Sequence, residues 1–169
     1  MRILRCAVAA LTIAIASGSA LAAETIYIPQ AVPFAEDAGV DKAIVDECKD
    51  LGPELLTTLE SAAKENGLTV ERNDAAVKAG KGKALVVEIT NAVSGGNAFI
   101  GHSKSVSVRG RLMENGKLVA KFTGSRASMG GMFGGYKSSC SVLGRCTATL
   151  GEDIAKWLKA PTDGARLGE

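Results

Sequence analysis

The sequence has one histidine, His102, and this scarcity limits the catalytic chemistry that the chain can perform. A Ser-His-Asp or Cys-His catalytic site would have to use that residue. No C-x2-C or H-x3-H pair is present, so the ligand spacing typical of structural zinc sites is missing. We therefore expect a protein that is not an enzyme and that binds no metal or other cofactor. The alternative is a metal-binding protein or enzyme that uses His102 together with Cys48, Cys140 and Cys146.

Aromatic residues and net charge are also scarce, and both absences argue against nucleic acid as a partner. One Trp, two Tyr and four Phe are scattered along the chain, without the stacking platform that binds single strands. The 20 basic residues include Arg2 and Arg5, which lie in an expected leader, so the rest of the chain carries 18 basic and 18 acidic side chains. A chain without net charge has no overall attraction for nucleic acid or for a membrane surface.

Residues 1–22 have the pattern of a secretory signal peptide. Two arginines precede an apolar run at 6–16, and Ala20 and Ala22 fit an A-x-A cleavage site. The apolar run is shorter than the ~20 residues that a membrane span needs, which argues against the alternative of a membrane anchor. We expect export to the periplasm, cleavage of the leader and no membrane anchor after cleavage.

The remaining chain is long enough for one domain with its own hydrophobic core. Hydrophobic spacing predicts strands at 25–30, 68–72 and 84–93, then two hairpin strands at 99–113 and 117–128. A first helix is expected from Asp41 to the Asn66-Gly67 pair, with an interruption at Gly52-Pro53, and a second helix ends near Lys159. Residues 30–41 are expected to form a loop.

This order of elements predicts an α/β (α+β) fold: a single mixed sheet of about five strands with two main helices packed on one face. We expect one periplasmic domain over residues 23–160, followed by a polar, disordered tail over 161–169. The sequence contains no internal repeat and no linker between domains.

Three cysteines remain after the leader, which predicts one disulfide and one free thiol in an oxidising compartment. A helix that already includes residues 140–146 separates Cys140 from Cys146 by about 9 Å, beyond the roughly 7 Å Cα limit for a bridge. One of the two would then pair with Cys48 on the first helix; Cys146 is the expected partner, and Cys140 is the alternative. If a capping box makes the last helix begin only at Thr149, a Cys140–Cys146 bridge becomes possible.

The register of the hairpin is predicted from its buried face. A two-residue turn at 115–116 would set the apolar rows of the two strands on opposite faces of the sheet. A three-residue loop at 114–116 places Leu112 opposite Leu118 and keeps both rows on one face. We therefore expect the three-residue loop, with Gly116 in the left-handed conformation.

The outer face of this hairpin is expected to carry Arg109, Arg111 and Lys121, with Arg109 directly opposite Lys121. One interpretation is a solvated face whose long side chains splay apart, since like charges across a sheet cost stability. The other interpretation is a small basic patch that binds an anionic partner.

A glycine-rich segment, MGGMFGGY at 129–136, joins the last hairpin strand to the last helix. It has neither the spacing of a phosphate-binding loop nor that of a dinucleotide fingerprint. It is either a mobile connection or a loop that binds a partner, because Phe133 and Tyr136 are more apolar than a linker needs.

From Thr25 to Lys159 the sequence resembles small exported α/β domains of unknown function from Gram-negative bacteria. The resemblance rests on IYIPQAVPF, DECKDLG, SVSVRGRLMENGKLVAKF and CSVLGRC followed by GEDIAKWL. The pattern is also similar to the N-terminal domain of the Tol-system protein TolB and to the penicillin-binding-protein activator lipoproteins. These resemblances imply a periplasmic domain, and they supply no catalytic residues.

Together these observations predict an exported, non-enzymatic periplasmic domain that binds another component or takes part in assembly of the cell envelope. Its expected partner is an envelope protein or other periplasmic component. The candidate binding residues are Arg109, Arg111, Lys121, Phe133 and Tyr136.

Overall fold

The computed structural model describes residues 24–95, 104–128 and 138–168, so the expected leader lies outside it. Within these residues seven strands form one mixed sheet with the order β3–β1–β4–β5–β6–β7, and β2 pairs with β4 outside this order. The strands are β1 (Thr25–Ile28), β2 (Phe34–Val40), β3 (Thr69–Arg72), β4 (Lys83–Ser94), β5 (Lys104–Glu114), β6 (Lys117–Ser128) and β7 (Ala165–Leu167). The helices are α1 (Lys42–Glu47), α2 (Leu51–Glu65), α3 (Asp74–Ala79) and α4 (Ser139–Lys159).

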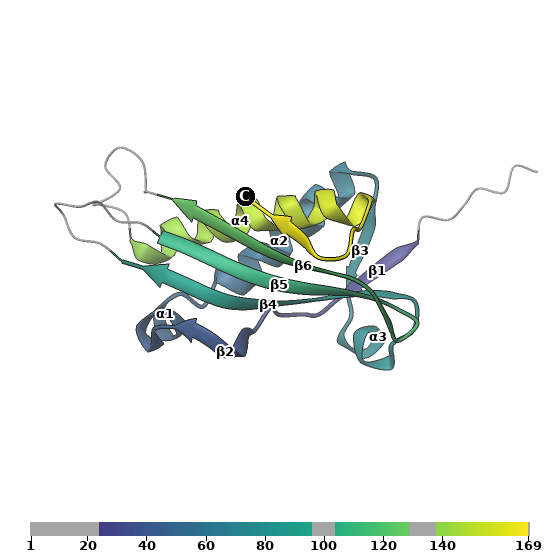
Figure 1. The fold of residues 1–169 in the computed structure, drawn as a ribbon, viewed down its shortest axis with the longest axis horizontal. Helices are drawn as coiled ribbons and strands as arrows, with labels where there is room; N and C mark the ends of the chain where they lie inside the picture. Colours follow the sequence, from purple (N-terminus) through teal and green to yellow (C-terminus); the bar gives the residue numbers. More distant parts are fainter. Residues whose placement is uncertain (1–23, 96–103, 129–137, 169) are drawn as a thin grey trace, which may run out of the picture.

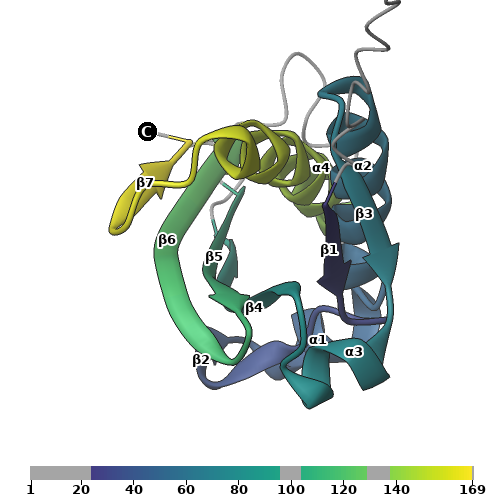
Figure 2. The ribbon, with the colours of Figure 1, turned by 90° about the vertical axis from the view of Figure 1, so that its right-hand side faces the viewer.

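The two long helices, α2 and α4, lie side by side against one face of the sheet (Figure 1). The sheet is strongly curved, with β1 and β3 beside α2 and with β7 at the far edge (Figure 2). β4, β5 and β6 are antiparallel to one another, whereas the other pairings are parallel. The predicted class is therefore confirmed, although the sheet has seven strands rather than about five.

The core forms where alternating strand residues meet the apolar faces of α2 and α4. Inward residues of β4 and β5 repeat every second position, and those of the helices repeat every three or four positions. The largest fully buried side chains are Ile28, Leu51, Leu55, Leu56, Leu59, Leu85, Val87, Ile89, Leu112, Leu143, Leu150 and Ile154. No helix among the described residues is long and apolar enough to cross a membrane.

The predicted interruption of the first helix is confirmed. α1 ends at Glu47 and α2 begins at Leu51, so Pro53 lies in the first turn of α2. The missing N–H of a proline costs no hydrogen bond there, because that N–H would have no acceptor within the helix. Gly67, with φ +75°, follows the last turn as expected.

Residues 34–40, which were expected to lie in a loop, form β2. This strand is parallel to β4, with Phe34 opposite Ile89 and Val40 opposite Ala92, and its register shifts between these pairs. Its sequence, FAEDAGV, shows no regular alternation, because an acidic pair interrupts the apolar positions. The strand therefore depends on backbone pairing with β4 and not on a hydrophobic pattern of its own.

The predicted hairpin register is wrong, although the predicted inner and outer faces of β5 are correct. The turn has two residues, Asn115 and Gly116, with φ values of +49° and +77°. A bulge at Val119 then places Leu112 opposite Ala120 and Met113 opposite Leu118. Because the extra residue shifts the phase of β6, its apolar row faces the core despite the two-residue turn.

The last helix begins earlier than the predicted capping box, and the chain after it is ordered. α4 starts at Ser139, and the hydroxyl of Ser138 accepts a hydrogen bond from the N–H of Ser141 at 3.2 Å. After α4, the three residues of β7 pair with Phe122–Gly124 of β6. The expectation of a disordered tail over 161–169 is therefore wrong for β7. A pattern of three residues is too short to predict a strand that pairs with β6.

The disulfide joins Cys48 to Cys140, the alternative partner, and not to Cys146. Because α4 already begins at Ser139, Cys140 lies in its first turn and meets the end of α1. Cys146 is about 9 Å further along the helix, where it is buried and free. Its Sγ lies 3.9 Å from the carbonyl oxygen of Lys104. The early start of α4 also excludes the Cys140–Cys146 bridge.

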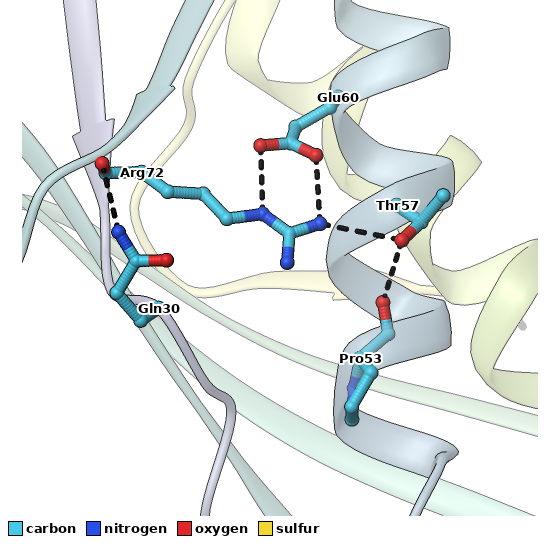
Figure 3. A network of polar contacts seen from close by, with 5 residues as sticks. All are labelled: Gln30, Pro53, Thr57, Glu60 and Arg72. Atoms are coloured by element: carbon cyan, nitrogen blue, oxygen red, sulfur yellow. Dashed lines mark hydrogen bonds and ion pairs between the residues drawn. The ribbon is translucent and has the colours of Figure 1, made fainter.

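Arg72 at the end of β3 fastens this edge strand to α2 (Figure 3). Its Nε and Nη2 donate to the two carboxylate oxygens of Glu60 at 2.8 and 2.7 Å, and Nη2 also donates to Thr57 Oγ1 at 3.2 Å. The Thr57 hydroxyl donates to the Pro53 carbonyl oxygen at 2.9 Å, and Gln30 Nε2 donates to the Arg72 carbonyl oxygen at 3.1 Å. The bond to Glu60 raises the pKa of the Arg72 guanidinium. This two-pronged pair holds the strand edge in place.

Gly110 allows the aromatic ring of Phe122 to lie directly across β5. A methyl group at Gly110 would come within 2.2 Å of that ring, and the ring cannot withdraw easily because it packs edge-on against Trp157 with a centroid distance of 4.8 Å. We expect Gly110→Ala to lower the free energy of unfolding by about 1–3 kcal/mol in urea titrations. Gly39→Ala is the matched control, because the nearest atom to its methyl group is 3.8 Å away. Equal losses in both variants would contradict this account.

The disulfide closes a loop with a sequence separation of 92 residues. We expect Cys48→Ser to lower the free energy of unfolding by as much as about 4–5 kcal/mol in the loop-entropy account. The Cys146 thiol should react with iodoacetamide only after denaturation, since burial raises its pKa and keeps it protonated. Urea titration measures the free energy of unfolding, and mass spectrometry of a non-reduced digest, after alkylation of the folded and unfolded protein, checks the pairing and the reactivity of Cys146. A peptide pair that contains Cys146 would contradict the assignment.

Candidate functional site

The face of the sheet opposite α2 and α4 carries polar side chains at every second position. Glu88 comes from β4, Arg109 and Arg111 from β5, and Lys121 and Thr123 from β6. Their inward neighbours along each strand are buried in the core. Because successive strand residues point to opposite faces, these five side chains lie together on the outer face.

A hollow of about 540 Å³ opens on this outer face. The chain that leads into β7 forms one of its walls. Its lining residues are Glu88, Arg109, Gly110, Arg111, Lys121, Phe122, Thr123, Gly164 and Ala165. The hollow therefore combines charged side chains with an apolar floor, as small-ligand sites commonly do.

Arg109 is held in place by two carboxylates. Its Nε donates to Glu88 at 2.8 Å, and its Nη1 donates to Asp37 of β2 at 3.0 Å. The hydrogen bond from Arg109 holds the pKa of Asp37 below its usual range, and both carboxylates raise the pKa of Arg109. Two negative charges offset this guanidinium, so Arg109 joins β2, β4 and β5 and does not attract a further anion strongly.

Arg111 and Lys121 form the basic part of the outer face. They are directly opposite each other on β5 and β6, and both side chains are exposed. Neither forms an ion pair within the part of the chain that the structure describes. Like charges opposite each other in a sheet repel, and an anionic group bound between them would remove that repulsion. We call these two residues the basic pair.

Hydroxyl groups continue the outer face beyond the basic pair. A second hollow, of about 400 Å³, shares Arg109 and Thr123 with the first. Its hydroxyl-bearing residues are Thr90, Ser107, Thr123 and Ser125, and the hydroxyls of Ser107 and Ser125 are 3.1 Å apart. These groups can donate to or accept from a polar ligand that extends along the strands.

Arg109, Arg111 and Lys121 lie together on one face of the sheet as predicted, but a different arginine is opposite Lys121. Arg111, not Arg109, is opposite Lys121, because the shorter turn and the bulge in β6 each shift the predicted register by one position. Phe133 and Tyr136 lie outside the described residues.

The sequence did not predict that two carboxylates, Glu88 and Asp37, would neutralise Arg109. Glu88 could have been found, because it occupies an outward position in the apolar strand 84–93. Asp37 lies in the segment that was expected to be a loop, so no pattern placed it beside Arg109.

A three-thiolate zinc site with His102 is incompatible with the disulfide, because Cys48 and Cys140 are oxidised. Among the described residues no group of three His, Cys, Asp or Glu side chains could hold a metal ion. His102 lies outside the described residues.

No protein-family model matches the sequence, and no curated protein matches it. Solved structures are similar to it in fold. The PelC dodecamer from Paraburkholderia phytofirmans is 17% identical, with a TM-score of 0.50 over 80% of this chain and 92% of that chain. Protein XCC0632 from Xanthomonas campestris, of family DUF330, is 10% identical, with a TM-score of 0.51 over 81% of this chain and 84% of that chain.

At these identities the likeness concerns the fold alone. It confirms the predicted resemblance to small domains from Gram-negative bacteria, which was drawn from four short sequence segments. It transfers no ligand and no site residue to this chain.

The ion pair between Asp37 and Arg109 predicts a pH-dependent stability. The folded pKa of Asp37 lies below its ordinary value of 3.8, so its carboxylate stabilises the fold above that value, and this stability is lost as the pH falls through the folded pKa. We expect Asp37→Asn to be less stable than the wild type at pH 7, with the difference shrinking as the pH falls below the ordinary pKa of 3.8 and through the lower folded pKa. Urea unfolding at several pH values measures this.

Glu36→Gln is the matched control, because Glu36 is an exposed acidic neighbour with no ion pair among the described residues. A difference between Asp37→Asn and the wild type that stays constant down to pH 2 would contradict the role of the ion pair.

Proposed function

We propose that this chain, with the fold of small Gram-negative domains, is an exported, non-enzymatic domain that binds an anionic group of another envelope component. The binding surface is the basic pair, Arg111 and Lys121, together with the adjoining hollow. The partner is an envelope protein or other periplasmic component that presents a carboxylate, phosphate or sulfate group at this surface.

Two features support an extracytoplasmic location. Residues 1–22 have the pattern of a secretory leader. The Cys48–Cys140 bridge fits an oxidising compartment, because disulfides persist there and are rare in the cytosol. The periplasm of a Gram-negative bacterium satisfies both conditions.

The main support for a binding role is that neighbouring cations on the outer face differ in whether a carboxylate neutralises them. Arg109 is neutralised by two carboxylates at 2.8 and 3.0 Å, whereas the basic pair beside it has no ion-pair partner among the described residues. The carboxylates thus fix the geometry of the hollow, and the positive charge available to a ligand is concentrated at Arg111 and Lys121. An arginine beside a lysine also supplies a planar fork and a mobile ammonium, which together suit an oxyanion.

The non-catalytic character of the proposal rests on the composition. Histidine, the commonest general base, occurs once in the sequence, and the carboxylates of the outer face, Glu88 and Asp37, are both bound to Arg109. Cations and hydroxyls at the mouth of a hollow suffice to hold an anion.

Crosslinking in a periplasmic extract, followed by capture of the tagged protein, tests the surface. We expect the double variant Arg111→Ala/Lys121→Ala to recover about tenfold less partner than the wild type, because it loses two charged contacts of at least about 0.7 kcal/mol each. Capture by the wild type should also fall as salt is added, since exposed charges are screened.

Lys64→Ala/Arg145→Ala is the matched control, because it removes the same charge from exposed positions on α2 and α4. If the basic-pair variant and this control recover the partner as well as the wild type, the surface is wrongly assigned. If Phe133→Ala alone abolishes capture, the glycine-rich segment is the binding surface.

A further inference from the structure

A buried lysine lies at the opposite end of β5 from the hairpin turn. Lys104 is the first residue of β5 and is only 4% exposed. Its ammonium donates to the hydroxyl of Ser94 at 2.8 Å and to that of Ser139 at 3.0 Å. Ser94 is the last residue of β4, directly opposite Lys104, and Ser139 is the first residue of α4. Three elements therefore converge on one amine.

The hydrogen bonds of this cluster leave donors without acceptors. A lysine ammonium has three N–H groups, and the two serines accept two of them. The Ser94 hydroxyl donates to Ser139 Oγ at 2.9 Å, which leaves the Ser139 hydrogen and the third ammonium hydrogen unused among the described residues. The N–H groups of Ser139 and Cys140, at the start of α4, also have no acceptor within the helix. Within the described part of the chain, these four donors of Lys104, Ser139 and Cys140 therefore lack an acceptor.

The charge of Lys104 is likewise not balanced. No carboxylate of the described residues forms an ion pair with it. Between Glu88 and Glu152 the sequence contains one acidic residue, Glu114, and that residue ends β5 far from Lys104. Neither 96–103 nor 129–137 contains Asp or Glu. Among the described residues this ammonium has no counter-charge, and Glu169 lies outside them. A buried charge of this kind is costly, so an anion bound here would stabilise the fold.

We propose that Lys104, Ser139 and the first turn of α4 bind an oxyanion, a carboxylate or phosphate group, at this end of the sheet. The oxyanion accepts from the third ammonium hydrogen, the Ser139 hydroxyl and the free N–H groups of α4. Ser94 accepts from the lysine and donates to Ser139, so it helps to hold both groups in place. The two serines are only partly buried, so they lie between the ammonium and the surface. This site is separate from the basic pair, because Lys104 points inward on β5 whereas Arg111 points outward.

Thermal unfolding of the purified protein in a Tris–chloride buffer tests the site, with inorganic phosphate and acetate added at matched ionic strength. We expect the unfolding temperature of the wild type to rise by roughly 5 °C when the better ligand is in about 100-fold excess over its Kd. The anion that raises the unfolding temperature at the lower concentration identifies the bound group as phosphate or carboxylate.

Lys104→Met should abolish the rise in unfolding temperature. Ser139→Ala should weaken the Kd about tenfold, because one charge-assisted hydrogen bond is lost.

Lys104→Met should be no less stable than the wild type in the anion-free buffer, because an apolar side chain of similar size replaces an unbalanced charge. Amide NMR spectra supply a second readout: phosphate or acetate should shift the Ser139 and Cys140 signals of the wild type. If Lys104→Met does not fold, the amide shifts of the wild type and the response of Ser139→Ala still test the site.

Arg111→Ala/Lys121→Ala should keep the full response to the anion, which separates this site from the proposed binding surface. The proposal is overturned if neither anion changes the unfolding temperature or these amide signals, or if Lys104→Met responds as the wild type does. It is also overturned if the response disappears only in the basic-pair variant. Partner capture is measured independently, so each proposal can fail without the other.

Discussion

The antiparallel pairing of β4, β5 and β6 determines the positions of Lys104, the basic pair and Arg109. Successive residues of a strand point to opposite faces, so a slip of one residue would exchange the core row with the polar row. In the observed register Lys104 points inward, whereas Arg109 and Arg111 point outward. The bulge at Val119 preserves this arrangement in β6, because it lets a two-residue turn coexist with an inward Phe122. The same ladder thus supports the core, the outer face and the lysine cluster.

Much of the fold could be predicted because its main elements have strong local patterns. The apolar strand 84–93, the helical spacing of the two long helices and the break at Pro53 are properties of neighbouring residues. β2 and β7 could not be predicted, since one lacks alternation and the other is three residues long, and both are stabilised by strands distant in the sequence. The bulge in β6 was missed for a related reason: the single extra residue, Val119, shifts the strand pairing, and no sequence pattern marks it.

In the candidate site, too, the features set by neighbouring residues could be predicted, and those set by residues distant in the sequence could not. The outward positions of three basic residues follow from alternation within β5 and β6. Whether each charge is available to a ligand depends on carboxylates that are 72 and 21 residues away from Arg109. Lys104 carried a local signal, because it occupies the same strand phase as Val106 and Val108. The exposed basic pair is screened by salt, whereas a charge in the interior interacts more strongly and at a higher desolvation cost.

β7 lies along the middle of β6 and pairs with three of its residues. Without Ala165–Leu167, the outward backbone groups of Phe122–Gly124 would have no neighbour in the sheet. Open strand edges pair readily with other chains. β7 therefore covers the part of the β6 edge where another chain could otherwise add a strand, and it protects the folded protein from association through that edge.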